Sequence, residues 1–307
     1  MAGRQALIAE VLKSMKTDFE SVMPDGHGEI VCPVCLRPFT NERGSKRRAS
    51  AEHIRPSSLG GTLEFPVITC TECNNAHGRQ FEAHLTRAMY AFDFLDGKGV
   101  MPVKIENELG HVSANLDWNA TPITFNVVGE KASDTRAVEA LPGVFRQDAK
   151  VKFTINFGFA AEPYWRAVLR IGYLAAFFQF GYRYVFSAGA AQVREILNGA
   201  AAPESLIMEA SPDGDPPLPL LVHALGDSIL VLFRTDSLIT RWTAVVLPGP
   251  NGSLWTDLAK AEMYARHLLL NVKFDKTGPS INFRFGRERV KEMRGLRAVP
   301  DADTSGD

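Results

Sequence analysis

The four cysteines of this 307-residue chain fall into two pairs with the same spacing. Cys32 and Cys35 form the first Cys-x-x-Cys pair, and Cys70 and Cys73 form the second. A two-residue spacer lets one tight turn present both sulfurs of a pair, and four thiolates are a ligand set of tetrahedral structural zinc. Because no cysteine is left over, the sequence predicts one structural Zn²⁺ rather than unrelated buried cysteines. Four thiolates leave no open position for a reacting water, so we do not expect this zinc to be catalytic.

A second group of polar residues lies between and just after the cysteine pairs. Its members are Glu52-His53-Ile54-Arg55-Pro56, the pair Gly60-Gly61, and Asn74-Asn75-Ala76-His77-Gly78. Hydrolysis of a phosphodiester needs an activated water and a cation that neutralises charge on the phosphate. Histidine suits the general base because it titrates near working pH, and carboxylate oxygens suit Mg²⁺ or Mn²⁺. These residue types therefore suggest catalysis and are compatible with hydrolysis of this kind.

This order of motifs resembles the HNH, or ββα-metal, endonuclease family, in the form that carries two Cys-x-x-Cys pairs. The resemblance covers about residues 28–95. It implies that His53 is the general base and that Glu52 and Asn74 are ligands of a catalytic Mg²⁺ or Mn²⁺. For His77, a third metal ligand, a phosphate contact and no role at all stay open. For Asn74, helix capping is an alternative to metal binding, and both roles could hold together.

Three positions depart from the family pattern. Glu52 stands where the family often has Asp, and this longer carboxylate still reaches a metal. The strand before the second cysteine pair usually opens with an Asn that orients the histidine, but Glu64 or Phe65 stands near that place. Whether Phe65 impairs catalysis stays open. Finally, His77 takes the place of the lysine in the usual Cys-Asn-x-x-Lys-Gly ending.

Basic residues cluster around these motifs, although the net charge of −1 gives no global reason to expect nucleic acid. A run of arginine and lysine lies inside the cysteine loop, just before Glu52 and His53. Such a run alone favours a solvated loop, but its place beside the motif favours contacts with a phosphate backbone. The predicted nucleic-acid contacts are Lys46, Arg47, Arg48, Arg55 and Arg79.

The pattern of apolar residues predicts an α+β fold in two domains. An amphipathic helix is expected within residues 1–27, followed by a zinc-bound ββα-metal nuclease domain at 28–98. A mixed α+β domain for specificity, sensing or partner binding would span 99–300, and 301–307 would be a disordered tail. The expected helices are 4–22, 74–95, 161–184 and 253–271. The expected strands are 64–70, 100–105, 111–117, 122–128, 151–157, 281–285 and two or three between 218 and 246.

The leading hypothesis is a metal-dependent endonuclease acting on DNA, of the restriction or defence-effector type, with the C-terminal domain controlling it. RNA is not excluded as a substrate, and the C-terminal domain could bind a protein partner or a small-molecule activator. The alternative is a zinc-stabilised nucleic-acid-binding module that has lost turnover. A homodimer would let two single-metal sites cut both strands, and the sequence leaves this open.

The chain carries no sign of membrane insertion or export. Its N-terminus lacks an apolar signal-peptide core, and the apolar stretch 171–180 is too short to span a bilayer. Arg170 and Arg183 flank that stretch, which favours a buried core helix. With 45% hydrophobic and 22% charged residues, the composition is that of a soluble globular protein, and we expect it in the cytoplasm.

Overall fold

The structure is a computed structural model that describes residues 2–24, 29–40, 44–62, 66–107, 110–119, 124–127, 152–200, 207–210, 218–225 and 228–249. The predicted helix 253–271, the predicted strand 281–285 and the predicted disordered tail 301–307 lie outside the described residues, as do Glu64 and Phe65. Within the described part of the chain, no helix is both long and apolar enough to cross a membrane.

A β-hairpin followed by a helix forms the centre of the N-terminal half. Strands β1 (Ala49–His53) and β2 (Pro66–Cys70) pair antiparallel, with Glu52 opposite Val67 and His53 opposite Pro66. Helix α2 (Thr71–His77) starts directly after the last residue of β2. This is the predicted ββα arrangement, with β1 and β2 joined through the short 3₁₀ helix η1 (Ser57–Leu59).

The predicted helix over 74–95 begins three residues earlier and is not uniform. After α2, a π-helical turn η2 (Gly78–Glu82) leads into α3 (Ala83–Leu95). The predicted N-terminal helix is confirmed as α1 (Ala2–Val22), whose apolar face packs against the hairpin. A π-helical turn rotates the residues that follow it relative to an α-helix, and such turns are frequent at functional sites.

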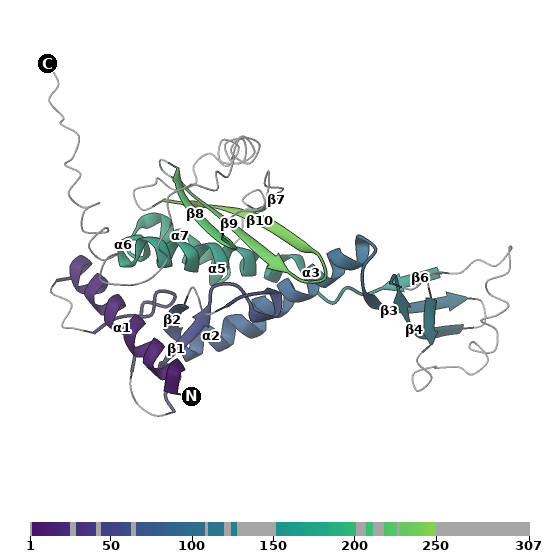
Figure 1. Ribbon diagram of the computed structural model, residues 1–307, viewed down its shortest axis with the longest axis horizontal. Coiled ribbons are helices and arrows are strands. Elements are labelled where there is room, and N and C mark those ends of the chain that lie inside the picture. The colour runs from purple at the N-terminus through teal and green to yellow at the C-terminus, as the bar shows by residue number, and fades with distance from the viewer. Residues whose placement is uncertain are drawn as a thin grey trace, which may run out of the picture.

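A long buried helix and a second sheet follow in the C-terminal half. Helix α5 (Ala161–Phe180) stops at Gly181, whose φ of +65° ends the predicted helix 161–184 early. The short helices α6 (Tyr182–Val185) and α7 (Ala188–Leu197) come next. In Figure 1, α5 runs between the second sheet on one side and the α2–α3 helices on the other. The sheet has the order β7 (Ile207–Ala210), β10 (Thr240–Pro248), β9 (Ser228–Asp236) and β8 (Leu220–Leu225).

The third sheet stands at the far end of α3 (Figure 1). Its strand order is β5 (Thr124–Val127), β4 (Gly110–Asp117), β3 (Val100–Asn107) and β6 (Lys152–Ile155), all antiparallel. It packs around its own small hydrophobic cluster, which includes Phe94 from the end of α3.

One large hydrophobic core joins the two halves of the chain. It contains Met15 of α1, Ile68 of β2, Leu85 of α3, Phe177 of α5 and Phe233 of β9. The core therefore crosses the predicted boundary near residue 98, while the third sheet lies outside it. The predicted α+β class, with the HNH-like hairpin and helix in the N-terminal half, is confirmed.

Candidate functional site

The four cysteine sulfurs converge on one point. They all lie within 4.8 Å of one another. Among the described residues, no other group of three or more His, Cys, Asp or Glu side chains converges in this way. Cys32, Cys70 and Cys73 are buried, and Cys35 is partly buried. Hydrogen bonding among the thiols lowers the pKa values of Cys35 and Cys70 and raises those of Cys32 and Cys73, so the four sulfurs titrate as one coupled group. The donor set and its convergence fit a structural Zn²⁺.

The local backbone explains how each pair turns both sulfurs inward. After the first pair, Leu36 adopts a φ of 59° and donates its N–H to the carbonyl of Cys32 at 2.9 Å. At the second pair, the N–H of Cys73 lies 3.4 Å from the sulfur of Cys70, which caps the start of α2. The N–H of Cys70 points to the sulfur of Cys32 at 3.3 Å and links the two turns. The cluster thus ties the end of β2 and the start of α2 to the first cysteine loop.

The Gly60-Gly61 pair makes a turn that no larger residue fits. Gly60 has a φ of +79°, and a Cβ there would lie 2.5 Å from a carboxylate oxygen of Asp236. A Cβ on Gly61 would lie 1.9 Å from the carbonyl oxygen of Arg55. The turn therefore lets the segment after β1 approach strand β9 of the second sheet.

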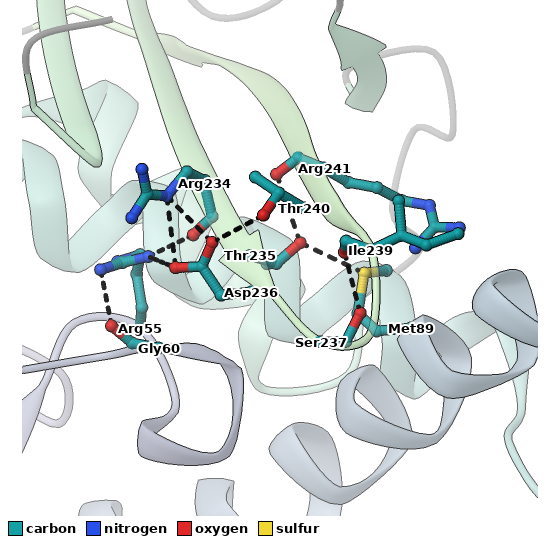
Figure 2. A network of polar contacts seen from close by, with 10 residues as sticks. All are labelled: Arg55, Gly60, Met89, Arg234, Thr235, Asp236, Ser237, Ile239, Thr240 and Arg241. Atoms are coloured by element: carbon teal, nitrogen blue, oxygen red, sulfur yellow. Dashed lines mark hydrogen bonds and ion pairs between the residues drawn. The ribbon is translucent and has the colours of Figure 1, made fainter. Parts of the chain in front are cut away.

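Arg55 lies inside this contact rather than on the surface. Its side chain is only 4% exposed. The guanidinium donates to the carbonyl of Gly60 at 2.8 Å and to the carbonyl of Arg234, and it lies 3.9 Å from the Asp236 carboxylate (Figure 2). A guanidinium engaged in this way is not available to a phosphate backbone. The structure thus separates Arg55 from the other predicted nucleic-acid contacts.

The other four predicted contacts are exposed. Lys46, Arg47 and Arg48 belong to the loop 44–48, which we call the basic loop, and Arg79 lies on η2. The N–H of Glu72 donates to the carbonyl of Lys46 at 2.6 Å, and that of Thr71 donates to the carbonyl of Arg48 at 2.8 Å. The basic loop is thereby fixed against the N-terminus of α2, one turn from Asn74. The backbone of the basic loop therefore lies beside the hairpin and the start of α2.

Replacing Arg55 is expected to affect stability, whereas replacing the basic loop is expected to affect nucleic-acid binding. Arg55→Ala removes the buried guanidinium that donates to the partly buried carbonyls of Gly60 and Arg234, so we expect the free energy of unfolding to fall by about 2–4 kcal/mol in urea denaturation. Lys46→Ala, Arg47→Ala and Arg48→Ala combined should leave stability within about 0.5 kcal/mol per site but reduce the salt dependence of nucleic-acid affinity by about three units of slope. If Arg55→Ala were fully stable and lost the same salt slope, Arg55 would belong to the binding surface.

Glu52 lies in the interior, between the hairpin and α5. It is 3% exposed, and one carboxylate oxygen forms an ion pair with Arg170 of α5, which is 1% exposed. The other oxygen accepts a hydrogen bond from the Thr69 hydroxyl of β2 at 2.5 Å. Arg170 also donates to Glu82 at 2.5 Å. One oxygen of the predicted metal ligand is therefore paired with a buried cation by charge, without a hydrogen bond among the described residues, and the other is hydrogen-bonded to β2.

Asn74 lies over the same face of β1 as Glu52. Its amide nitrogen donates to the hydroxyl of Ser50 at 3.0 Å, and Ser50 and Glu52 share a face because they are two residues apart on the strand. The same alternation puts the neighbouring His53, which is partly buried, on the opposite face of β1. The structure thus places Asn74 and Glu52 on one face of β1 and His53 on the other.

His77 lines a cavity on the other side of α2. The cavity has a volume of about 710 Å³ and is bounded by the first cysteine loop, α2, η2 and the ends of α5 and α7. None of Glu52, His53 and Asn74 lines it. His77 is 6% exposed, and burial lowers its pKa to about 4, so the ring is neutral at working pH. Its Nδ1 has no hydrogen-bond partner among the described residues, and its ring lies 5.0 Å from that of Phe81.

The predicted ligands of a catalytic Mg²⁺ or Mn²⁺ are not assembled in this arrangement. These cations take oxygen ligands at close range in near-octahedral geometry. Glu52 is paired with Arg170, and His77 faces the cavity instead of the hairpin. For Asn74, the amide nitrogen donates the hydrogen bond to Ser50 on the hairpin face, so that bond does not use the side-chain oxygen. The donor set therefore fits zinc at the cysteines but does not fit a divalent cation at Glu52 as it stands.

Arg170, Thr69 and Glu82 complete this site and were not predicted from the sequence. Arg170 carried a usable signal, because a cation at the edge of a long apolar helix must find a carboxylate when it is buried. Neither the pattern of apolar residues nor any motif indicates which carboxylate that is. Arg170 and Glu52 are far apart in the chain, and their contact depends on how α5 packs on the hairpin.

Comparison with known proteins agrees with this geometry. Residues 32–90 match the family model of the HNH endonucleases. The match contains both cysteine pairs, β1, β2, α2 and most of α3, so it confirms the resemblance predicted from the motifs. No significant match to the chain was found among curated proteins or among solved structures.

Proposed function

With residues 32–90 as an HNH endonuclease domain, we propose that the protein is an endonuclease that hydrolyses phosphodiester bonds of DNA. The family match supports a nuclease-type function and nucleic-acid binding in general. DNA rather than RNA as the substrate is the further step that we propose. The observation that carries the proposal is the hairpin and helix, which are held by the cysteine cluster and present Asn74 beside the strand of Glu52 and His53.

In this proposal His53 is the general base. It is the last residue of β1, partly buried, and the backbone of β2 lies opposite it at Pro66. A base in such a position can accept a proton from a water that attacks the phosphate. The exposed cations of the basic loop and Arg79 would hold the strand that is cut.

The proposed catalytic cation is Mg²⁺ or Mn²⁺, with Glu52 and Asn74, and His77 as a third candidate, as ligands. When bound, such a cation neutralises developing charge on the phosphate. The contacts of Glu52 with Arg170 and Thr69 would have to be exchanged for it. His77 would have to turn away from the cavity that it lines.

We further propose that the C-terminal part controls the nuclease, as in a restriction or defence effector. Its support is that elements beyond residue 98 reach the HNH domain directly. Arg170 of α5 contacts Glu52, and Asp236 of β9 contacts Arg55, two residues after His53 (Figure 2). A partner or ligand that changed the packing of this part would therefore change the surroundings of the proposed site.

The ion pair of Glu52 favours a second candidate function. A carboxylate that is permanently neutralised by a buried guanidinium does not bind a catalytic metal. The protein would then be a zinc-stabilised module that binds nucleic acid through the basic loop without cutting it.

One assay distinguishes the two candidates. Supercoiled plasmid is incubated with the full chain in Mg²⁺ or Mn²⁺, and parallel samples contain excess EDTA. Nicked or linear plasmid that EDTA abolishes is the expected result for the nuclease. Retarded but intact plasmid in a gel shift would favour the binding module, and intact plasmid without retardation would contradict both candidates.

A further inference from the structure

Arg170 lies between two carboxylates of the HNH domain, although it comes from a distant helix. It contacts Glu52 of β1 and, at 2.5 Å, Glu82 of η2. The guanidinium therefore provides the positive charge that two acidic residues at the proposed site require. In the proposed function, a divalent cation has that role at Glu52.

The packing of α5 fixes the position of this guanidinium. Every residue from Ala167 to Phe178 is buried. The hydroxyl of Tyr173, three residues after Arg170, donates to the carbonyl of Pro33 in the first cysteine loop at 2.5 Å. On the opposite side, a Cβ at Gly172 would lie 2.6 Å from Val245 of β10, so helix and sheet are in close contact. Moving Arg170 away by displacing α5 would expose this core.

The two carboxylates differ in their access to water. The Glu82 side chain is 27% exposed, whereas the Glu52 side chain is 2% exposed. Glu52 is thus the carboxylate that most depends on the guanidinium, since it is nearly inaccessible to water. A buried carboxylate without a cation is strongly unfavourable.

We propose that Arg170 occupies the cation position at Glu52 and is a positioning residue that sets the affinity of this site for divalent cations. The inference rests on the proposed role of Glu52 in the HNH domain. The guanidinium and a divalent cation compete for the same carboxylate. The protein with Arg170 in place therefore binds Mn²⁺ weakly at this site, because the cation must displace the guanidinium from Glu52.

The test measures Mn²⁺ affinity without nucleic acid. The probe is Mn²⁺ alone, followed by electron paramagnetic resonance and by thermal shift on the full chain with zinc bound. Arg170→Met should bind Mn²⁺ about tenfold or more tightly than the unaltered protein. Its melting temperature should be lowered without Mn²⁺ and raised again by Mn²⁺. Arg166→Met, one turn earlier on α5, is the matched control and should leave the Mn²⁺ response unchanged.

Two further variants keep the inference testable if Arg170→Met folds poorly. The double variant Glu52→Gln with Arg170→Met removes both charges and should fold without gaining Mn²⁺ affinity. Glu52→Gln alone should bind Mn²⁺ no more tightly than the unaltered protein. A gain of Mn²⁺ affinity in the double variant, or equal affinity in Arg170→Met and the unaltered protein, would overturn the inference.

This readout also separates the inference from the proposed function. If Arg170→Met gains Mn²⁺ affinity but cuts no plasmid, the competition is supported and the proposed hydrolysis fails. If the unaltered protein cuts plasmid and Arg170→Met gains no Mn²⁺ affinity, the nuclease is supported and the competition by Arg170 is overturned.

Discussion

Cys73→Ser is expected to abolish zinc binding and cooperative folding together. Structural zinc contributes an apparent binding free energy of about 10–16 kcal/mol, which matches or exceeds the whole stability of an ordinary domain, about 5–15 kcal/mol. The four sulfurs converge within 4.8 Å, so the loss of one thiolate leaves an incomplete tetrahedral set. Because Cys73 is also in the first turn of α2, its loss frees the start of the helix that carries Asn74.

Metal analysis and circular dichroism check this expectation. The unaltered chain should contain one zinc ion, and Cys73→Ser should contain none and lose its sharp thermal transition. Val34→Ala is the control, because Val34 is buried in the first cysteine loop but is not a ligand. It should cost about 1–3 kcal/mol through its cavity and keep the zinc. A zinc-free Cys73→Ser protein that melts like the unaltered chain would show that the cluster is not structural.

His53→Ala is expected to have the second large effect, this time on catalysis. A positioned general base contributes about 10²–10⁴-fold to a reaction rate, so the initial rate of plasmid cleavage should fall by about 10³-fold. Stability should change little, because His53 is at the end of β1 and only partly buried. Zinc content and gel-shift affinity should also be retained.

The matched control for His53 is His111→Ala. His111 is exposed on β4, in the third sheet, and should leave both cleavage and stability unchanged. If His53→Ala cuts plasmid as fast as His111→Ala, the general base lies elsewhere. In that case His77 would be the next residue to replace, because its neutral ring lines a cavity beside the cysteine cluster.

Short-range features of the molecule could be predicted from the sequence. The cysteine spacing predicts the cluster, because each pair is closed by a local turn. Apolar periodicity predicts α1, α5 and the strands β3 and β4 closely. Helix α7 and strand β7 were not predicted. The small residues that begin α7, Ala188-Gly189-Ala190-Ala191, carry little amphipathic pattern of their own.

Long-range contacts could not be predicted. Arg55 and Arg79 look alike in the sequence, yet one is buried against Asp236 and the other is exposed on η2. The difference arises because the glycine turn brings the segment after β1 to β9, a strand far away in the sequence. Likewise, the sequence predicts Glu52 as a metal ligand, whereas the packing of α5 places Arg170 beside it. Burial decides the role of both residues, and burial is a property of the assembled core.

The shared hydrophobic core also determines whether the HNH segment can fold apart from the rest of the chain. Ile68 and Leu85 pack in the same cluster as Phe177 and Phe233, so a fragment cut near residue 98 would lose the partners of its own interior. A transfer of residues 32–90 into another protein would therefore also have to include α5 and the second sheet. The third sheet is the opposite case: inserted between α3 and α5 with a cluster of its own, it is the part of the described chain best suited to exchange.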